Sequence, residues 1–101
     1  QVVRPAGARS TPWALVEASP ADLHVTAIKR AERGDSVIVR AVNLGPARVT
    51  GRITAGFDVR EAHVVDLAED RQAALTVLRG RSVEVAVRSK QIVTVELVPA
   101  R

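Results

Sequence analysis

Apolar and polar residues alternate with a period of two along much of this sequence, and this pattern restricts the fold more than any other feature. Residues 47–55 read Ala-Arg-Val-Thr-Gly-Arg-Ile-Thr-Ala, so apolar or small residues occupy every second position. Because successive side chains of a β-strand point to opposite faces, the segment predicts a strand with one buried face. Residues 82–88 and 91–98 repeat the pattern. The predicted inward-facing residues there are Val83, Val85, Val87, Val93, Val95 and Leu97, with Thr94 and Glu96 facing outward.

Further strands are predicted where β-branched runs lie between turn residues. Arg33-Gly34-Asp35 is predicted to close a hairpin. Residues 67–78 are interpreted as an irregular loop followed by a short strand. About seven short strands, spaced by roughly 8–12 residues, are typical of an all-β, immunoglobulin-like antiparallel sandwich, which is the predicted fold class. The four additional strands are predicted over residues 13–17, 23–32, 36–44 and 59–67.

A chain of 101 residues fits one domain with a single core. We assign residues 12–101 to the sandwich and residues 1–11, which are rich in Ala, Gly, Arg and Pro, to a linker or strand-less lead-in. The sequence does not begin with Met, so we expect it to be a piece of a longer protein. Trp13 is expected to fill one end of the core.

Composition limits the compartments and partners that fit the chain. It has no cysteine, which excludes disulfides and thiolate metal sites and is compatible with the expected cytoplasmic location. No apolar run approaches the ~20 residues of a membrane span, so we expect no membrane partner. We expect the chain by itself to be a monomer.

The net charge of +4 makes nucleic acid a partner to consider, because basic proteins bind its phosphates. The densest basic run, Arg79-Gly80-Arg81, has no aromatic neighbour on which a base could stack. The other arginines stand singly between apolar residues, as solvent-facing strand positions do, so we expect no nucleic-acid partner. These isolated residues are Arg40, Arg48, Arg52, Arg60 and Arg88.

The residues that could carry chemistry do not form a catalytic set. Neither His24 nor His63 has a second ligand at helical or hairpin spacing, and His63 is interpreted as a histidine within a sheet. No serine lies in a nucleophile elbow, and no glycine-rich loop could hold a phosphate. Glu69 and Asp70 are adjacent carboxylates, but adjacent side chains diverge, and we interpret them as a solvated acidic loop. We therefore predict no catalytic, cofactor-binding or metal-binding residue in this chain.

Three stretches carry a resemblance to a known family. A strand ending in Ala27-Ile28-Lys29 leads through an acidic turn to Ile38-Val39-Arg40, with Asn43 three residues later. Residues 65–69 read Val-Asp-Leu-Ala-Glu, and residues 91–97 read Gln-Ile-Val-Thr-Val-Glu-Leu. In their order and spacing, these stretches resemble the C-terminal β-sandwich of the α-mannosidases of glycoside hydrolase family 38. The chain departs from the family pattern at Val42, where an aromatic is common, and at Gln91, where an acid is common.

This resemblance implies an accessory domain of a zinc-dependent retaining α-mannosidase. The family's zinc ligands and nucleophile lie in upstream domains, so the zinc is expected in the parent's catalytic domain and not here. The resemblance also implies structural roles for Lys29, Arg40 and Asn43. We expect Arg40 to pair with Glu32 or Glu69, and Asn43 to cap the turn at residues 45–46 through its side chain.

The expected partner is the rest of the parent enzyme, bound through a sheet face. Strand positions with apolar residues on both faces are candidates for this contact, because one face fills the core and the other would be too apolar for a solvated sheet. Two other hypotheses stay open, namely an independent immunoglobulin-like adhesion or carbohydrate-binding module and a basic nucleic-acid-associated domain. With one Trp, one Phe and no Tyr, the chain lacks the usual aromatic platform for sugars. The candidate docking residues are Val37, Ile38, Val39, Val42, Val64 and Val65.

Overall fold

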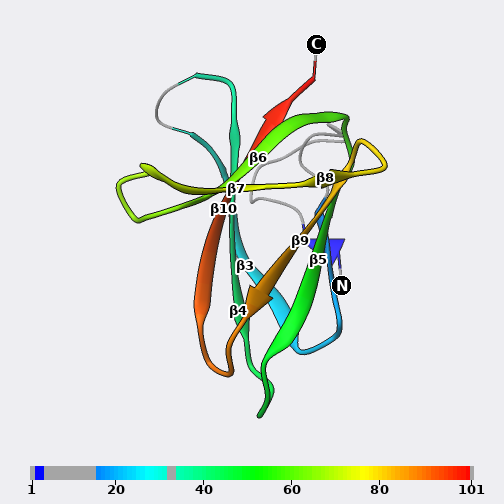
Figure 1. The fold of residues 1–101 in the computed structure, drawn as a ribbon, viewed down its shortest axis with the longest axis vertical. Coiled ribbons are helices and arrows are strands. Elements are labelled where there is room, and N and C mark those ends of the chain that lie inside the picture. The colour runs from blue at the N-terminus through cyan, green and yellow to red at the C-terminus, as the bar shows by residue number, and fades with distance from the viewer. Residues whose placement is uncertain (1, 4–15, 32–33, 101) are drawn as a thin grey trace.

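The structure, a computed structural model, describes residues 2–3, 16–31 and 34–100 (Figure 1). Ten strands and no helix run through these residues, so the all-β prediction is confirmed. No helix in these ranges has the length and apolar character needed to cross a lipid bilayer. The strands are β1 (Val2–Val3), β2 (Val16–Ser19), β3 (Leu23–Arg30), β4 (Val37–Asn43), β5 (Val49–Ala55), β6 (Val59–Val65), β7 (Arg71–Leu75), β8 (Val77–Leu78), β9 (Ser82–Val87) and β10 (Ile92–Pro99).

The strands form two antiparallel sheets that pack as a sandwich. The first sheet has the order β1-β2-β5-β9-β8, and the second sheet has the order β3-β4-β10-β6-β7. β3 and β4 form the hairpin that the sequence predicted around Gly34, whose positive φ of 78° suits glycine. Each of the seven predicted strands has a counterpart, although β2 meets the predicted range 13–17 only at Val16 and Glu17, since residues 13–15 lie outside the described residues. β1 is additional, and β7 and β8 fall within residues 67–78, where a short strand was expected.

The core lies between the sheets and is built from the predicted inward faces. The inward-facing valines of β9 and the inward residues of β10 are all buried, as the alternation predicted. Gly51 in β5 allows the sheets to approach closely, because a Cβ at this position would lie 2.4 Å from Cδ2 of the fully buried Leu23. A side chain at this position would therefore force Leu23 out of its place in the core.

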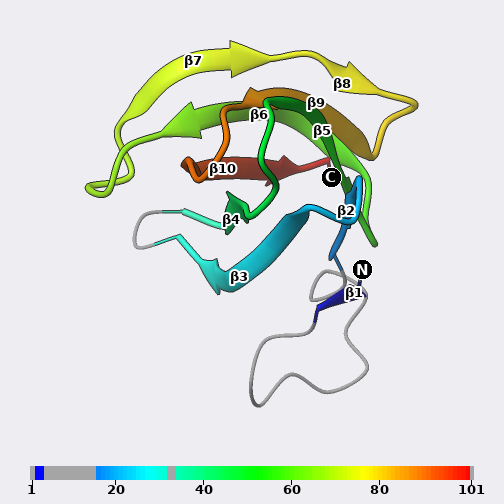
Figure 2. The ribbon, with the colours of Figure 1, turned by 90° about the horizontal axis from the view of Figure 1, so that it is seen from below.

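One edge of the sandwich is shared by both sheets. β7 pairs with β6 in the second sheet, whereas β8 pairs with β9 in the first sheet, so the chain changes sheets at Thr76. Figure 2 shows β7 and β8 as one continuous run along this edge. The interpretation of residues 67–78 as a loop followed by a short strand holds, although the structure divides that strand between two sheets.

The N-terminal segment differs from its prediction in one respect. Val2 and Val3 form β1, which pairs with Glu17 and Val16 of β2, so the expectation of a strand-less lead-in is wrong for these two residues. Two residues are too few to show an alternation, and their pairing depends on the edge that β2 offers. Trp13 lies outside the described residues.

Candidate functional site

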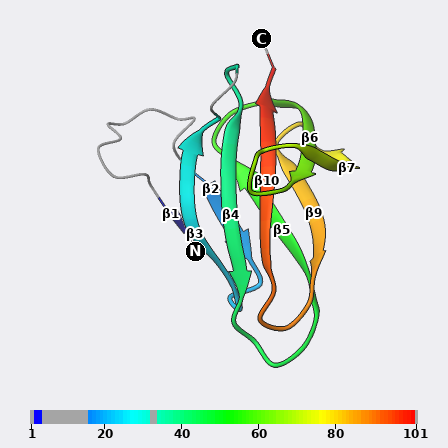
Figure 3. The same cartoon turned by 90° about the vertical axis from the view of Figure 1, so that its left-hand side faces the viewer.

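The outer face of the second sheet, which points away from the core, carries most of the half-buried polar groups. Ile38, Arg40 and Val42 of β4 point outward there, opposite Glu96, Thr94 and Ile92 of β10. Figure 3 looks onto this face and shows the segment between β6 and β7 crossing in front of β10. Segment 66–71 therefore covers part of the face and leaves the rest open.

Ile38 lies beneath this covering segment. Its side chain is only 3% exposed and forms a small apolar cluster with Ala31 and Val65. Its cross-strand neighbours, Lys29 and Glu96, are both bound by the covering segment, through Glu69 and Arg71 respectively. Ile38 is therefore buried by its own chain and is not available to a partner.

This burial removes Ile38 from the docking candidates. Val37 and Val39 fill the main core and Val64 packs against it, as expected for the inward face of each strand. Val65 is covered together with Ile38. Val42, which is half-buried on the outer face, is the one candidate that lies in the open part. Apolar runs in the sequence did not distinguish a face covered by the chain itself from a face left for a partner.

Four charged or polar side chains form a network at the edge of the covered part. Arg71 donates from Nε to Glu96 Oε1 at 2.8 Å, and its Nη1 lies 3.6 Å from Glu61 Oε1. His63 Nε2 lies 2.8 Å from the same Glu61 oxygen. The hydrogen bond with His63 holds the pKa of Glu61 below its ordinary value, and the hydrogen bond to Glu96 raises the pKa of Arg71. The prediction of His63 as a sheet histidine is confirmed, since it lies within β6.

The loop containing Glu69 and Asp70 is more ordered than a solvated acidic loop. Asp66 Oδ1 accepts hydrogen bonds from the backbone N–H groups of Ala68 and Asp70, both at 2.9 Å. This turn directs Glu69 back onto the sheet, where its side chain is only 10% exposed and pairs with Lys29 at 3.0 Å. The expected solvation of Glu69 is therefore wrong. Its salt bridge is with Lys29 instead of the expected Arg40.

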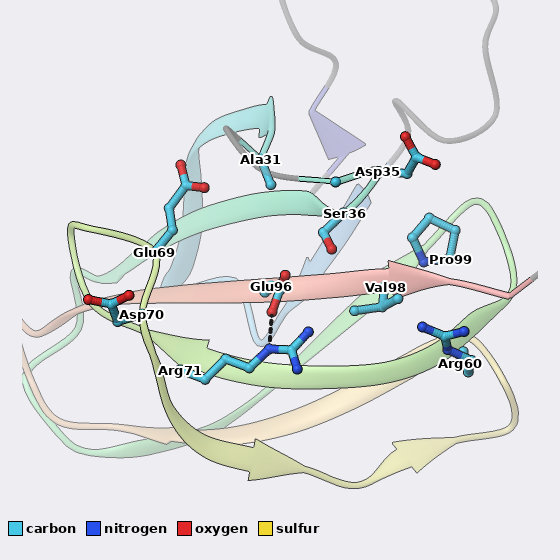
Figure 4. Close-up of a pocket in the computed structure, with 11 residues that line it drawn as sticks. Ala31, Asp35, Ser36, Arg60, Glu69, Asp70, Arg71, Glu96, Val98 and Pro99 are labelled. Atoms are coloured by element: carbon cyan, nitrogen blue, oxygen red, sulfur yellow. Dashed lines mark hydrogen bonds and ion pairs between the residues drawn. The ribbon is translucent and has the colours of Figure 1, made fainter.

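An open pocket of about 870 Å³ lies beside this network, between the β3–β4 hairpin and the end of β10. Figure 4 shows that Glu69 and Asp70 point in different directions and that Glu96 faces Arg71. Glu96 is thus held in an ion pair by Arg71, which also approaches Glu61, so both carboxylates are engaged by the same cation. Two of the acids that line the pocket, Glu69 and Glu96, are therefore engaged by cations of this chain.

A metal site is also missing from the part of the chain that the structure describes. No group of three His, Cys, Asp or Glu side chains lies close enough there to hold an ion. His24 in β3 and His63 in β6 are separated by β4 and β10. The described residues therefore offer no set of ligands for a zinc ion, which the family resemblance implies only for the catalytic domain of the parent enzyme.

Asn43 has the structural role that the sequence predicted. Its Oδ1 accepts a hydrogen bond from the Gly45 N–H at 2.9 Å, which confirms the turn cap. Its Nδ2 donates to the carbonyls of Ala47 at 2.9 Å and Val87 at 3.0 Å. The side chain is fully buried and joins the end of β4 to β9 in the other sheet.

Arg40 differs from what we expected of it. It was expected to be a solvent-facing strand arginine that pairs with Glu32 or Glu69, yet it is half-buried, and its Nε is inaccessible and has no hydrogen-bond partner among the described residues. Glu69 pairs with Lys29 instead, and Glu32 lies outside the described residues. The alternation places it correctly on the outer face. Whether its guanidinium meets a partner depends on segment 66–71, which no local pattern predicts.

One of three comparisons with known proteins returned a match, and it is to a family of β-sandwich domains. The family model described as "Glycosyl hydrolases family 38 C-terminal beta sandwich domain" matches residues 22–95. Neither the search of the curated proteins nor the search of the solved structures returned a match. The matched region contains β3 to β9 entire and includes Lys29, Arg40 and Asn43. Because this match spans well over half of the 101 residues, the chain belongs to the family of C-terminal β-sandwich domains of family 38 glycosyl hydrolases.

Proposed function

We propose that this chain is the non-catalytic accessory β-sandwich of a zinc-dependent α-mannosidase, and that it docks on the catalytic part and stabilises it. The observation that carries the proposal is the family match over residues 22–95. The expected cytoplasmic location of the enzyme belongs to the same proposal.

The arrangement of charges in the sandwich supports an accessory role. Glu96 and Glu69, the buried acids nearest the open pocket, are bound by Arg71 and Lys29. A general acid or base must be free to exchange a proton with a substrate, whereas these carboxylates hold segment 66–71 onto the sheet. The zinc and the nucleophile of the proposed enzyme would then belong to residues outside this chain.

An activity assay on two proteins tests this proposal. The isolated chain is expected to show no hydrolysis of an aryl α-mannoside above background, with or without added zinc. The whole enzyme that contains the domain serves as the positive control. Turnover that follows the isolated chain through purification would contradict the proposal, because it would require a catalytic set within these residues.

A deletion tests the stabilising role separately. Removing the sandwich from the whole enzyme is expected to lower the midpoint of heat inactivation, because the surface that the sandwich covered would be exposed to water. The specific activity at low temperature is expected to fall less than the thermal midpoint does. An enzyme without the domain that is as heat-resistant as the whole enzyme would exclude a stabilising function.

A further inference from the structure

Part of the outer face of the second sheet is left open by segment 66–71. We call this part the open half-face, and it consists of outward residues on three neighbouring strands. The strand register places His24, Val42 and Ile92 in one row across the sheet, and Ala27, Arg40 and Thr94 in the next row. Figure 3 shows β3, β4 and β10 side by side here.

The open half-face is more apolar than a solvated sheet face. Ile92 is 60% exposed at its centre, beside Val42, and Ala27 is exposed in the adjoining row. The outer face of the first sheet is different, because its side chains pair with one another. Arg52 binds Glu84 at 2.8 Å and Thr54 shares a hydrogen bond with Ser82 at 2.8 Å. The outer face of the first sheet thus carries paired polar side chains that suit contact with water, whereas the open half-face of the second sheet exposes apolar side chains.

Arg40 has no side-chain partner on the open half-face, whereas the cations beside it do. Lys29 pairs with Glu69 and Arg71 pairs with Glu96, while no hydrogen bond or ion pair engages the Arg40 guanidinium among the described residues. Its Nε is inaccessible to water, so solvent does not satisfy this donor. A buried donor on a charged group without a partner is costly and is rare in folded proteins.

The strands of the open half-face cannot supply the missing anion. β3 and β4 contain no acidic residue, and the only acid of β10 is Glu96, which Arg71 already binds. The half-face therefore presents a positive charge beside apolar groups, without a carboxylate of its own. Its complement is a surface with a carboxylate among apolar side chains, because arginine pairs strongly with carboxylates when water is excluded.

We propose that the open half-face is the surface by which this sandwich docks on the rest of the glycosidase, and that the docked surface presents a carboxylate to Arg40. This inference rests on the proposed function, which supplies the partner. Contacts between domains of one protein bury roughly 600–1,500 Å², which three neighbouring strands can provide. Arg40 is the specific contact, and Ile92 and Val42 provide the apolar area around it.

Charge variants of the whole enzyme test this surface. Arg40→Glu is expected to speed heat inactivation at a fixed temperature by about tenfold or more, because it places two carboxylates together in a contact without water. Ile92→Lys is expected to act in the same direction. Arg48→Glu is the matched control, since Arg48 is exposed, lies outside the open half-face and makes the same change of charge. It is expected to leave the rate unchanged.

The same variants in the isolated chain separate docking from folding. Arg40→Glu and Arg40→Leu are expected to leave its melting temperature unchanged or slightly raised, since the Arg40 side chain has no partner to lose among the residues that the structure describes. In the whole enzyme, Arg40→Lys is expected to preserve more stability than Arg40→Leu, because it keeps the charge. A loss of melting temperature in the isolated chain equal to that in the enzyme would overturn the proposal.

Three other outcomes are informative. If deleting the sandwich weakens the enzyme but the Arg40 and Ile92 variants do not, this surface is wrong and the proposed function stands. If deleting the sandwich has no effect on the enzyme, the proposed function is wrong, and the docking surface that rests on it is wrong as well. If the isolated chain dimerises and Arg40→Glu abolishes the dimer, the occupant is a second copy and the assigned partner is wrong.

Discussion

At the scale of single residues, Asn43 is the polar side chain on which the sandwich depends most. Its three hydrogen bonds join a turn to the other sheet in a place that water does not reach. Asn43→Ala would leave two carbonyls and one N–H without partners, so we expect it to lower the free energy of unfolding by about 2–4 kcal/mol. Urea unfolding measures this loss as a shift in midpoint at constant slope.

Ser89→Ala is the control for Asn43. It removes one hydrogen bond, from Ser89 Oγ to the Gly45 carbonyl at 2.6 Å, in the same region of the fold. We expect a loss of about 1 kcal/mol from this change. If Asn43→Ala costs no more than Ser89→Ala, the network around Asn43 does not hold the two sheets together.

Glu61 is the residue that should link stability to pH. Its hydrogen bond with His63 holds its pKa below its ordinary value of 4.5. A lowered pKa in the folded state means that the ionised carboxylate stabilises the fold. This contribution is complete above the unfolded pKa and is lost as the pH falls below 4.5 through the folded pKa.

The expected result is a pH-dependent difference between wild type and Glu61→Gln. The wild type should melt higher than Glu61→Gln at about pH 7, and this gap should shrink towards about pH 3. Glu17→Gln is the control, because Glu17 is exposed and makes no ion pair with the described residues. A gap that is constant across this range would show that the Glu61 carboxylate does not stabilise the fold.

At the scale of elements, segment 66–71 converts part of a sheet face into a second small core. Ile38 lies in this core at 3% exposure, so Ile38→Lys would bury a charge without a partner. We expect this variant to lose several kcal/mol and to be largely unfolded at room temperature. Circular dichroism and thermal melting of the isolated chain are the measurements.

Ile92→Lys is the matched control for Ile38→Lys. Both are isoleucines on the outer face, but Ile92 is 60% exposed. We expect Ile92→Lys to fold with a melting temperature close to that of the wild type. If Ile38→Lys also stays folded, segment 66–71 does not cover the sheet in solution as it does in the structure.

At the scale of the whole molecule, several arginines lie beside acids of the same chain, which lowers the positive potential around them although the net charge stays at +4. Arg52, Arg60, Arg71 and Arg81 each pair with an acid of this chain. We therefore expect only weak DNA binding without sequence preference, with a dissociation constant on the order of 10⁻⁴ M or weaker at physiological salt. Fluorescence anisotropy with a labelled duplex measures it. Submicromolar binding that resists salt would favour a nucleic-acid-associated domain instead.

The alternation in the sequence was sufficient to predict the strands and their inward faces, because both are local properties of an extended chain. Val83 to Val87 and Val93 to Leu97 show this directly, and so does the Asn43 cap, which reaches a turn only two residues away. The alternation did not indicate which outward residues stay in water. Thr94 and Glu96 face outward as predicted, yet they are only 7% and 8% exposed.

The sequence by itself determined the all-β class, the hairpins and the composition of the main core, because strand period and turn chemistry act over a few residues. Only the tertiary structure decided how the outer face is divided. Glu69 reaches Lys29 and Arg71 reaches Glu96 across long separations in the chain, and these contacts cover Ile38. The same contacts leave the Arg40 Nε without a hydrogen-bond partner among the described residues. Such contacts depend on where the sheet brings distant segments together, which no local pattern specifies.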